Sequence, residues 1–160
     1  MKRRVLLTFA AMTLAGGAFA QDVEPKGPQP ELPKEKLVIV THDGKDHVFN
    51  VEMATTPEQQ KTGEMFRTSI PADGGMLFDW GSPRPTQMWM KNTLVPLDMI
   101  FINADGTIRS IAEDTVPHSL AVIDAGGPVR ATLEVNAGTT AKLDIRVGDK
   151  VKQRIFGDAP

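Results

Sequence analysis

Residues 63–106 read GEMFRTSIPADGGMLFDWGSPRPTQMWMKNTLVPLDMIFINADG. Short apolar runs alternate here with breaks rich in Gly and Pro, which is the spacing of strands joined by turns. Polar side chains interrupt runs that otherwise read as buried strands; they are Arg67, Lys91, Asn92 and Asp98, with Trp89 beside them. A buried polar group without a partner costs roughly 1 to 3 kcal/mol. The stretch therefore predicts a β-rich fold and the position of a candidate site.

The strand pattern continues on both sides of this stretch. Apolar runs bounded by turn residues predict strands at 37–40, 48–53, 76–78, 86–92, 97–102, 107–112, 129–136 and 150–156. Only two short helices are expected: one opens with a capping box at Thr56 and Gln59 and ends at Gly63, and one runs from Thr139 to Leu143. We predict an all-β single domain, an antiparallel β-sandwich or partly open barrel with two short helices.

The N-terminal residues indicate export. Residues 2–4 are basic, residues 5–15 are apolar, and residues 18–20 read AFA. This is the pattern of a secretory signal peptide over residues 1–20, and its apolar run is shorter than the roughly 20 residues that span a bilayer. A Pro-rich solvated linker should follow at 21–34, and a single domain at 35–160. The mature protein is expected in the periplasm or outside the cell, with no membrane span.

Charge and cysteine content exclude some classes of function. The chain has 18 Lys and Arg against 20 Asp and Glu. Three of the basic residues and none of the acidic ones lie in residues 1–20, so the mature chain carries 15 against 20, a net charge of -5. Nucleic acid is therefore not expected as a partner, because its binding relies on clustered cations. The chain has no Cys, which excludes disulfides and thiolate metal sites.

Strand periodicity brings the polar residues together. In a strand at 86–92, Trp89 and Lys91 share one face. Asp98 interrupts a strand that is apolar on both faces, so it should be buried and paired with Arg67 or Lys91. Glu134 lies on the polar face of the strand at 129–136. The candidate ligand-binding residues are Arg67, Trp89, Lys91, Asn92, Asp98 and Glu134; the alternative is a structural ion-pair network among the same residues.

Metal sites have weaker support. His42 and His47 flank a predicted turn, where a solvated turn is the favoured interpretation because the spacing matches no known metal motif. Met88 and Met90 offer thioethers that suit Cu(I), although core packing explains methionines in apolar strands. We predict no metal and no cofactor.

Four motifs resemble a known family. GEMFR (63–67), PADGGMLF (71–78), WMKNTLVPLD (89–98) and LEVNAG (133–138) resemble the domain of unknown function 192 family over nearly all of residues 36–151. The resemblance implies a small β-rich domain, often exported, without an established activity. The polar positions of the family motifs fall on Arg67, Lys91, Asn92, Asp98 and Glu134. One departure is Glu64, where the family usually has Leu or another apolar residue; it puts only the packing of the helix end in doubt.

Three functions remain open at this point. The first is a non-catalytic periplasmic binding or accessory domain. In it Trp89 stacks on a cell-envelope sugar or peptide, and Lys91, Asn92 and Asp98 form hydrogen bonds with this ligand. The second is a hydrolase or lyase that uses Asp98 and Glu134, or Lys91, for proton transfer. The third is a copper-handling module through Met88 and Met90. No catalytic residue is assigned, and the oligomeric state stays open.

Overall fold

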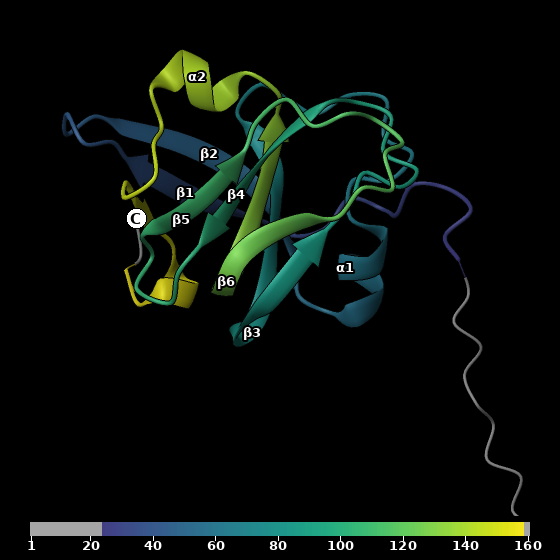
Figure 1. The fold of residues 1–160 in the computed structure, drawn as a ribbon, viewed down its shortest axis with the longest axis horizontal. Helices are drawn as coiled ribbons and strands as arrows, with labels where there is room; N and C mark the ends of the chain where they lie inside the picture. Colours follow the sequence, from purple (N-terminus) through teal and green to yellow (C-terminus); the bar gives the residue numbers. More distant parts are fainter. Residues whose placement is uncertain (1–23, 159–160) are drawn as a thin grey trace, which may run out of the picture.

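Seven strands form one mixed β-sheet in the computed structural model, which describes residues 24–158 (Figure 1). The strands are β1 (Lys34–Val40), β2 (Asp46–Ala54), β3 (Gly74–Met88), β4 (Leu97–Ile102), β5 (Ile108–Ala112), β6 (Ile123–Asn136) and β7 (Lys150–Lys152). They are ordered β5-β4-β6-β3-β2-β1-β7 across the sheet. The helices are α1 (Pro57–Thr62), α2 (Thr139–Leu143) and a single 3-10 turn, η1 (Arg154–Phe156). The predicted signal peptide at 1–20 lies outside the described residues.

The sheet curls until its edge strands approach each other. Thr107, just before β5, bridges to Lys150 of β7, and the amide of Val151 donates to the carbonyl of Gly106 at 2.7 Å. Figure 1 shows α1 and α2 on opposite sides of the curled sheet. The structure confirms an all-β, partly open barrel with two short helices rather than a sandwich. No helix within residues 24–158 combines the length and apolar character needed to cross a bilayer.

One strand pair departs from the expected antiparallel arrangement. β2 and β3 run parallel, with Asn50 opposite Gly74 and Ala54 opposite Phe78. Parallel neighbours need a long crossover that returns the chain to its starting end. Helix α1 and the turns that follow it supply this crossover. The site described below is built where α1 passes beside the sheet.

Local sequence signals account for the short elements. Thr56 and Gln59 form the predicted capping box of α1, and Gly63 ends the helix. Turn residues at 42–46 and 103–106 account for two hairpins, in which β1 pairs with β2 and β4 pairs with β5 in antiparallel register. In the second hairpin Gly106 has a φ of 81°, a conformation that strains residues with a Cβ atom.

The barrel interior contains the main hydrophobic core. Its side chains come from all seven strands and from the residues around α2, and they include Leu37, Ile39, Phe49, Val51, Leu77, Ile100, Ile108, Leu133 and Val151. Only the inside of a curled sheet can bring every strand into one cluster, so this face is the interior. Alternation along β6 places Leu133 inside and therefore turns Glu134 outward.

The outer face of the central strands is also buried. Met90, Leu97, Met99 and Phe101 form one cluster there, and Ala54, Met76 and Phe78 form another with Leu32 packed against it. All six residues of β4 are buried, as predicted for a strand that is apolar on both faces. Loops and the N-terminal segment cover this face, so the polar side chains of β6 on it are enclosed as well.

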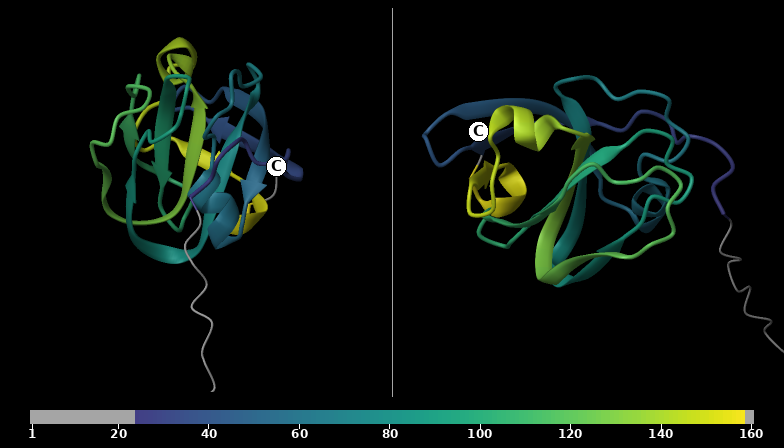
Figure 2. Two further views of the ribbon diagram at one scale, coloured as in Figure 1. Left: turned by 90° about the vertical axis from the view of Figure 1, so that its right-hand side faces the viewer. Right: turned by 45° about the horizontal axis from the view of Figure 1, so that its top comes forward.

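The N-terminal segment packs onto the domain from residue 24 onward (Figure 2). Gln29 donates its amide to the carbonyls of Gln59 and Gly63, at 3.1 and 2.9 Å, and the Leu32 amide donates to Glu52 Oε2 at 2.7 Å. Residues 24–34 are exposed or half-buried, and this part of the expected solvated linker nevertheless makes these contacts with the domain. Gln29 thus bonds carbonyl groups at the end of α1, and the Leu32 side chain packs against the cluster of Ala54, Met76 and Phe78. Amino-acid composition by itself does not reveal such contacts.

Candidate functional site

The predicted strand at 86–92 is wrong beyond Met88. β3 ends there, and Asn92 takes a positive φ of 56° in a turn. Pro96 and the turn residues favour a loop, which overrides the period-two pattern. Trp89 and Lys91 nevertheless meet, because Lys91 Nζ lies 5.1 Å from the centroid of the Trp89 ring. Lys91 also pairs with Glu24 at 2.9 Å, so its charge is engaged at the surface.

Asp98 is buried as predicted, but its predicted pairing with Arg67 or Lys91 is wrong. Its carboxylate accepts four hydrogen bonds, from the Thr140 hydroxyl (2.7 Å), the Thr140 amide (2.9 Å), the Asp114 amide (3.0 Å) and the Gly138 amide (3.2 Å). Gly138 has no side chain to cap α2, so Asp98 satisfies the free amides of that helix from β4. Asp98 lies opposite Val135 of β6, so it faces the other side of the sheet from Glu134, and its role is structural.

Arg67 belongs to a buried ion-pair network. Its guanidinium contacts both carboxylate oxygens of Glu52, with Nη2 2.8 Å from Oε2. Its Nε lies 3.1 Å from Oε2 of Glu64. The alternative interpretation, a structural ion pair, thus holds for Arg67, with Glu52 as the partner in place of Asp98 or Glu134.

A cavity of about 370 Å³ lies between α1 and β3, and we call it the α1–β3 pocket. Its lining combines residues at the end of α1, two tryptophans and one side chain from β6: Pro57, Gln60, Lys61, Thr62, Gly63, Glu64, Met65, Phe78, Trp80, Arg84, Gln87, Met88, Trp89, Thr93 and Glu134. Of the six predicted site residues, Trp89 and Glu134 line it. A volume of this size falls in the range of small-molecule sites, about 300 to 1,000 Å³.

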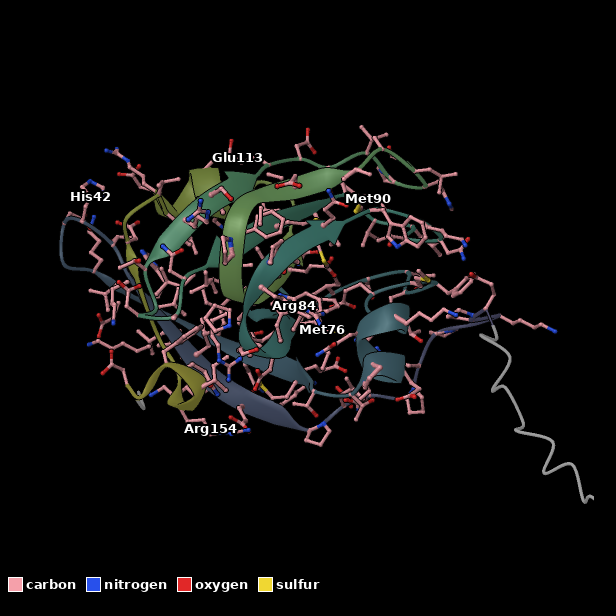
Figure 3. All side chains as sticks on the ribbon, turned by 60° about the horizontal axis from the view of Figure 1, so that its bottom comes forward. His42, Met76, Arg84, Met90, Glu113 and Arg154 are labelled. Atoms are coloured by element: carbon pink, nitrogen blue, oxygen red, sulfur yellow. The ribbon has the colours of Figure 1, made fainter. Side chains whose placement is uncertain are left out.

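Two indoles contribute aromatic surface to the α1–β3 pocket. Trp80 is held in place, since its Nε1 donates to the Thr132 hydroxyl at 3.1 Å and its ring stacks on Phe78 with the centroids 5.6 Å apart. The guanidinium of Arg84 lies 4.5 Å from the Trp80 ring centroid. Figure 3 shows Arg84 beside α1. Trp89 is 47% exposed, which leaves much of its ring available to a ligand.

Two buried carboxyl groups also line the pocket. Glu64 is 2% exposed and Glu134 is 4% exposed. Neither carboxylate oxygen of Glu64 has a hydrogen-bond donor within the described part of the chain. Burial raises the pKa of Glu64 to about 7, against the lowering effect of the Arg67 charge. Burial also raises the pKa of Glu134 well above its ordinary value, and the charge of Glu64 raises it further.

A comparison with known protein families identifies the family of this chain. A family model described as DUF192, uncharacterized ACR, matches residues 38–153. The chain belongs to the DUF192 family. The resemblance seen in the sequence motifs is thereby confirmed. No curated protein matches the chain.

Two solved structures share the DUF192 fold with this chain. One, from Sinorhizobium meliloti 1021, is described as a proposed transcription regulator; it is 46% identical with a TM-score of 0.77, over 79% of this chain and 98% of its own. The other, a protein of unknown function from Novosphingobium aromaticivorans DSM 12444, is 36% identical with a TM-score of 0.75, over 90% of this chain and 100% of its own. Neither description establishes an activity for the family.

Asn92 supports the wall of the pocket in this DUF192 domain without lining it. Its carbonyl accepts the Phe66 amide at 2.8 Å, and its side-chain amide lies 3.9 Å from the sulfur of Met65. Met65 in turn lines the pocket. Asn92 therefore positions the segment that carries Glu64, and its left-handed backbone suits an Asn.

The candidate metal ligands lie in separate environments. His42 is at the β1–β2 turn, at the end of the molecule away from α1 (Figure 3). Within residues 24–158, no group of three or more His, Cys, Asp or Glu is placed to hold a metal ion. Met90 is fully buried and its sulfur accepts the Thr115 hydroxyl at 3.1 Å, whereas Met88 lines the α1–β3 pocket. The Met90 sulfur therefore lies in the core, whereas Met88 lies at the wall of the pocket.

The pocket also brings together Glu64, Trp80 and Arg84, which are not among the site residues predicted from the sequence. Glu64 follows the polar helix α1 and Gly63, so no apolar run marks it as Asp98 is marked; its only signal is the departure from the apolar residue usual in the family. In the structure Glu64 contributes a carboxyl group to the pocket, which goes beyond an effect on helix-end packing. Trp80 and Arg84 carry no comparable local signal, because only the course of β3 beside α1 brings them to the cavity.

Proposed function

We propose that this DUF192 protein is an exported binding domain whose α1–β3 pocket holds a cell-envelope sugar. One observation carries the proposal: two indoles and two buried carboxyl groups line the same cavity, and Glu64 lacks a hydrogen-bond donor among the described residues. Aromatic faces pack on the C–H faces of sugar rings, and carboxyl oxygens accept hydrogen bonds from hydroxyl groups. A few convergent polar groups in a partly apolar pocket are typical of ligand sites.

Other ligand classes have less support. The S. meliloti relative, as a proposed transcription regulator, would suggest nucleic acid. The net charge of -5 expected for the mature chain opposes this ligand, because phosphate contacts require clustered cations. A peptide is less favoured than a sugar, because the exposed indole of Trp89 matches the flat apolar face of a sugar ring.

A second candidate function is a hydrolase or lyase that uses Glu64 and Glu134. Two carboxyl groups with raised pKa values in one cavity are a common arrangement for acid–base catalysis. The residues differ from those expected from the sequence. Asp98 is occupied as the cap of α2, and Lys91 pairs with Glu24; neither lines the α1–β3 pocket.

The enzymatic alternative has its own experiment. Envelope glycans are incubated with the purified mature protein and analysed by mass spectrometry. Products that form with the parent and disappear in Glu134→Gln would establish catalysis. Intact glycans that remain bound to the parent would support a binding domain.

A screen of envelope glycans against the mature protein tests the binding proposal. We expect Trp89→Ala to weaken the binding of a glycan found in this screen by roughly 30-fold, because a tryptophan at the centre of an interface contributes about 2 kcal/mol or more. Titration calorimetry measures the change. Trp89→Phe should retain most of the affinity. Val48→Ala is the control, since Val48 is 54% exposed on β2 and does not line the pocket. Equal affinities in Trp89→Ala and the parent would place the ligand elsewhere.

We also expect the mature protein to begin at Gln21 and to be found outside the cytoplasm, because residues 1–20 have the pattern of a signal peptide. Mass spectrometry of the N-terminal peptide from the extracytoplasmic fraction tests this. Replacing the basic residues at 2–4 with neutral ones should reduce export. An intact Met1 on protein retained in the cytoplasm would contradict the proposal.

A further inference from the structure

The carboxyl groups of the α1–β3 pocket lack the partners that buried carboxylates need. Arg67 directs both terminal nitrogens of its guanidinium to Glu52, which leaves only Nε near Glu64. That Nε contact is an ion pair without hydrogen-bond geometry, so both oxygens of Glu64 remain without a donor among residues 24–158. Glu134 also receives no hydrogen bond from another described side chain or amide. A ligand that supplies donors would remove this deficit.

The number and charge of the missing donors favour an ammonium group. A sugar hydroxyl offers one donor, whereas a primary ammonium offers three donors and no acceptor. Two carboxyl groups in one site also repel each other when both ionise, and a cation placed between them removes this repulsion. A neutral acetamido group supplies a single N–H and adds a carbonyl oxygen, which the oxygens of Glu64 and Glu134 repel.

The aromatic residues of the pocket already accommodate cations. Arg84 lies over Trp80 and Lys91 lies over Trp89, which shows that both rings present a face to positive charge. An ammonium ligand would find the same attraction at the exposed part of Trp89. Arg84 and Lys61 also line the cavity, so the ligand's positive charge has to sit at the two carboxyl groups, away from these side chains.

We propose that the α1–β3 pocket selects amino sugars with a free ammonium group over their N-acetylated counterparts, through Glu64 and Glu134. This rests on the proposed function, and it narrows the ligand from envelope sugars in general to those with an unmodified amine. The charged groups around the two carboxyls are Arg67 and Glu52 behind Glu64, and Lys61 and Arg84 in the pocket lining.

The test compares glucosamine tetramer with N-acetylglucosamine tetramer by titration calorimetry on the mature protein at pH 6. We expect the amino sugar to bind at least tenfold more tightly. Its binding should release protons, seen as a dependence of the binding heat on the ionisation enthalpy of the buffer, because the ammonium displaces protons from the carboxyl groups. The acetylated tetramer should show no such dependence.

Two variants assign the effect to the carboxyl groups. Glu64→Gln and Glu134→Gln keep the side-chain shape, and each should reduce amino-sugar affinity at least tenfold while leaving the acetylated tetramer unchanged. Glu58→Gln removes an exposed carboxylate from the same helix and serves as the matched control. Thermal melting verifies that each variant is folded at the assay temperature.

The outcomes separate this inference from the proposed function. Equal or tighter binding of the acetylated tetramer would overturn the ammonium preference and would leave a sugar-binding pocket in place. Retention of full amino-sugar affinity in both Gln variants would also overturn it, because the selectivity would then come from other residues. Failure of both tetramers and of the wider glycan screen would overturn the proposed function itself.

Discussion

Replacing Asp98 with alanine should lower the free energy of unfolding by about 3 to 5 kcal/mol. Four donors lose their acceptor in this variant, and an unsatisfied buried donor costs roughly 1 to 3 kcal/mol before the structure relaxes. The loss would be a large part of the roughly 5 to 15 kcal/mol that stabilises an ordinary domain. Urea denaturation of the purified variant measures it.

Two further variants define the cause of this loss. Asp98→Asn retains one acceptor oxygen and should destabilise the domain less than Asp98→Ala. Thr140→Val removes the hydroxyl donor and should cost about 1 kcal/mol. An unfolding free energy of Asp98→Ala within 1 kcal/mol of the parent would show that the β4–α2 connection does not depend on this carboxylate.

Replacing Glu64 with leucine should make the domain more stable at neutral and alkaline pH. The pKa of Glu64 is about 7 in the folded protein, above its ordinary value of 4.5. Between these two pH values the folded state keeps a proton that the unfolded chain has released, so the parent loses stability as the pH rises from about 4.5 to about 7. The full loss, on the order of 3 kcal/mol, persists above pH 7. The leucine variant lacks this loss.

The measured quantity is the difference in unfolding free energy between Glu64→Leu and the parent at several pH values. It should grow in favour of the variant from pH 4.5 to pH 7 and remain constant above that. Glu58→Leu, at an exposed position of α1, is the matched control for the loss of a carboxylate from this region. A constant difference for Glu64→Leu would mean that Glu64 titrates at its ordinary pKa.

Two buried carboxyl groups show how differently the sequence marks burial. Asp98 interrupts an apolar run, whereas Glu64 follows the polar helix α1 and Gly63, and both are buried. Asp98 meets four donors because the start of α2 and the loop after β5 lie beside β4. Glu64 meets none among the described residues and opens on a cavity. An apolar run around a carboxylate predicts its burial, but the neighbours that satisfy a buried carboxylate come from elsewhere in the chain.

The sequence by itself determined the parts of this fold that depend on signals within a few residues. The capping box of α1, the Gly63 stop, the two hairpins and the apolar character of β4 follow from side-chain chemistry and backbone preference within short windows. These features depend on neighbours that are close along the chain, so the sequence contains them directly.

Only the tertiary structure decided the parallel pairing of β2 with β3, the cap that Asp98 provides, and the pocket itself. Glu64 and Glu134 are 70 positions apart, and they share a cavity because α1 packs beside the outer face of β3 and β6. Trp80 and Arg84 join them through the same packing. Such contacts depend on how the whole sheet curls and on what covers it, and no local period or spacing specifies either.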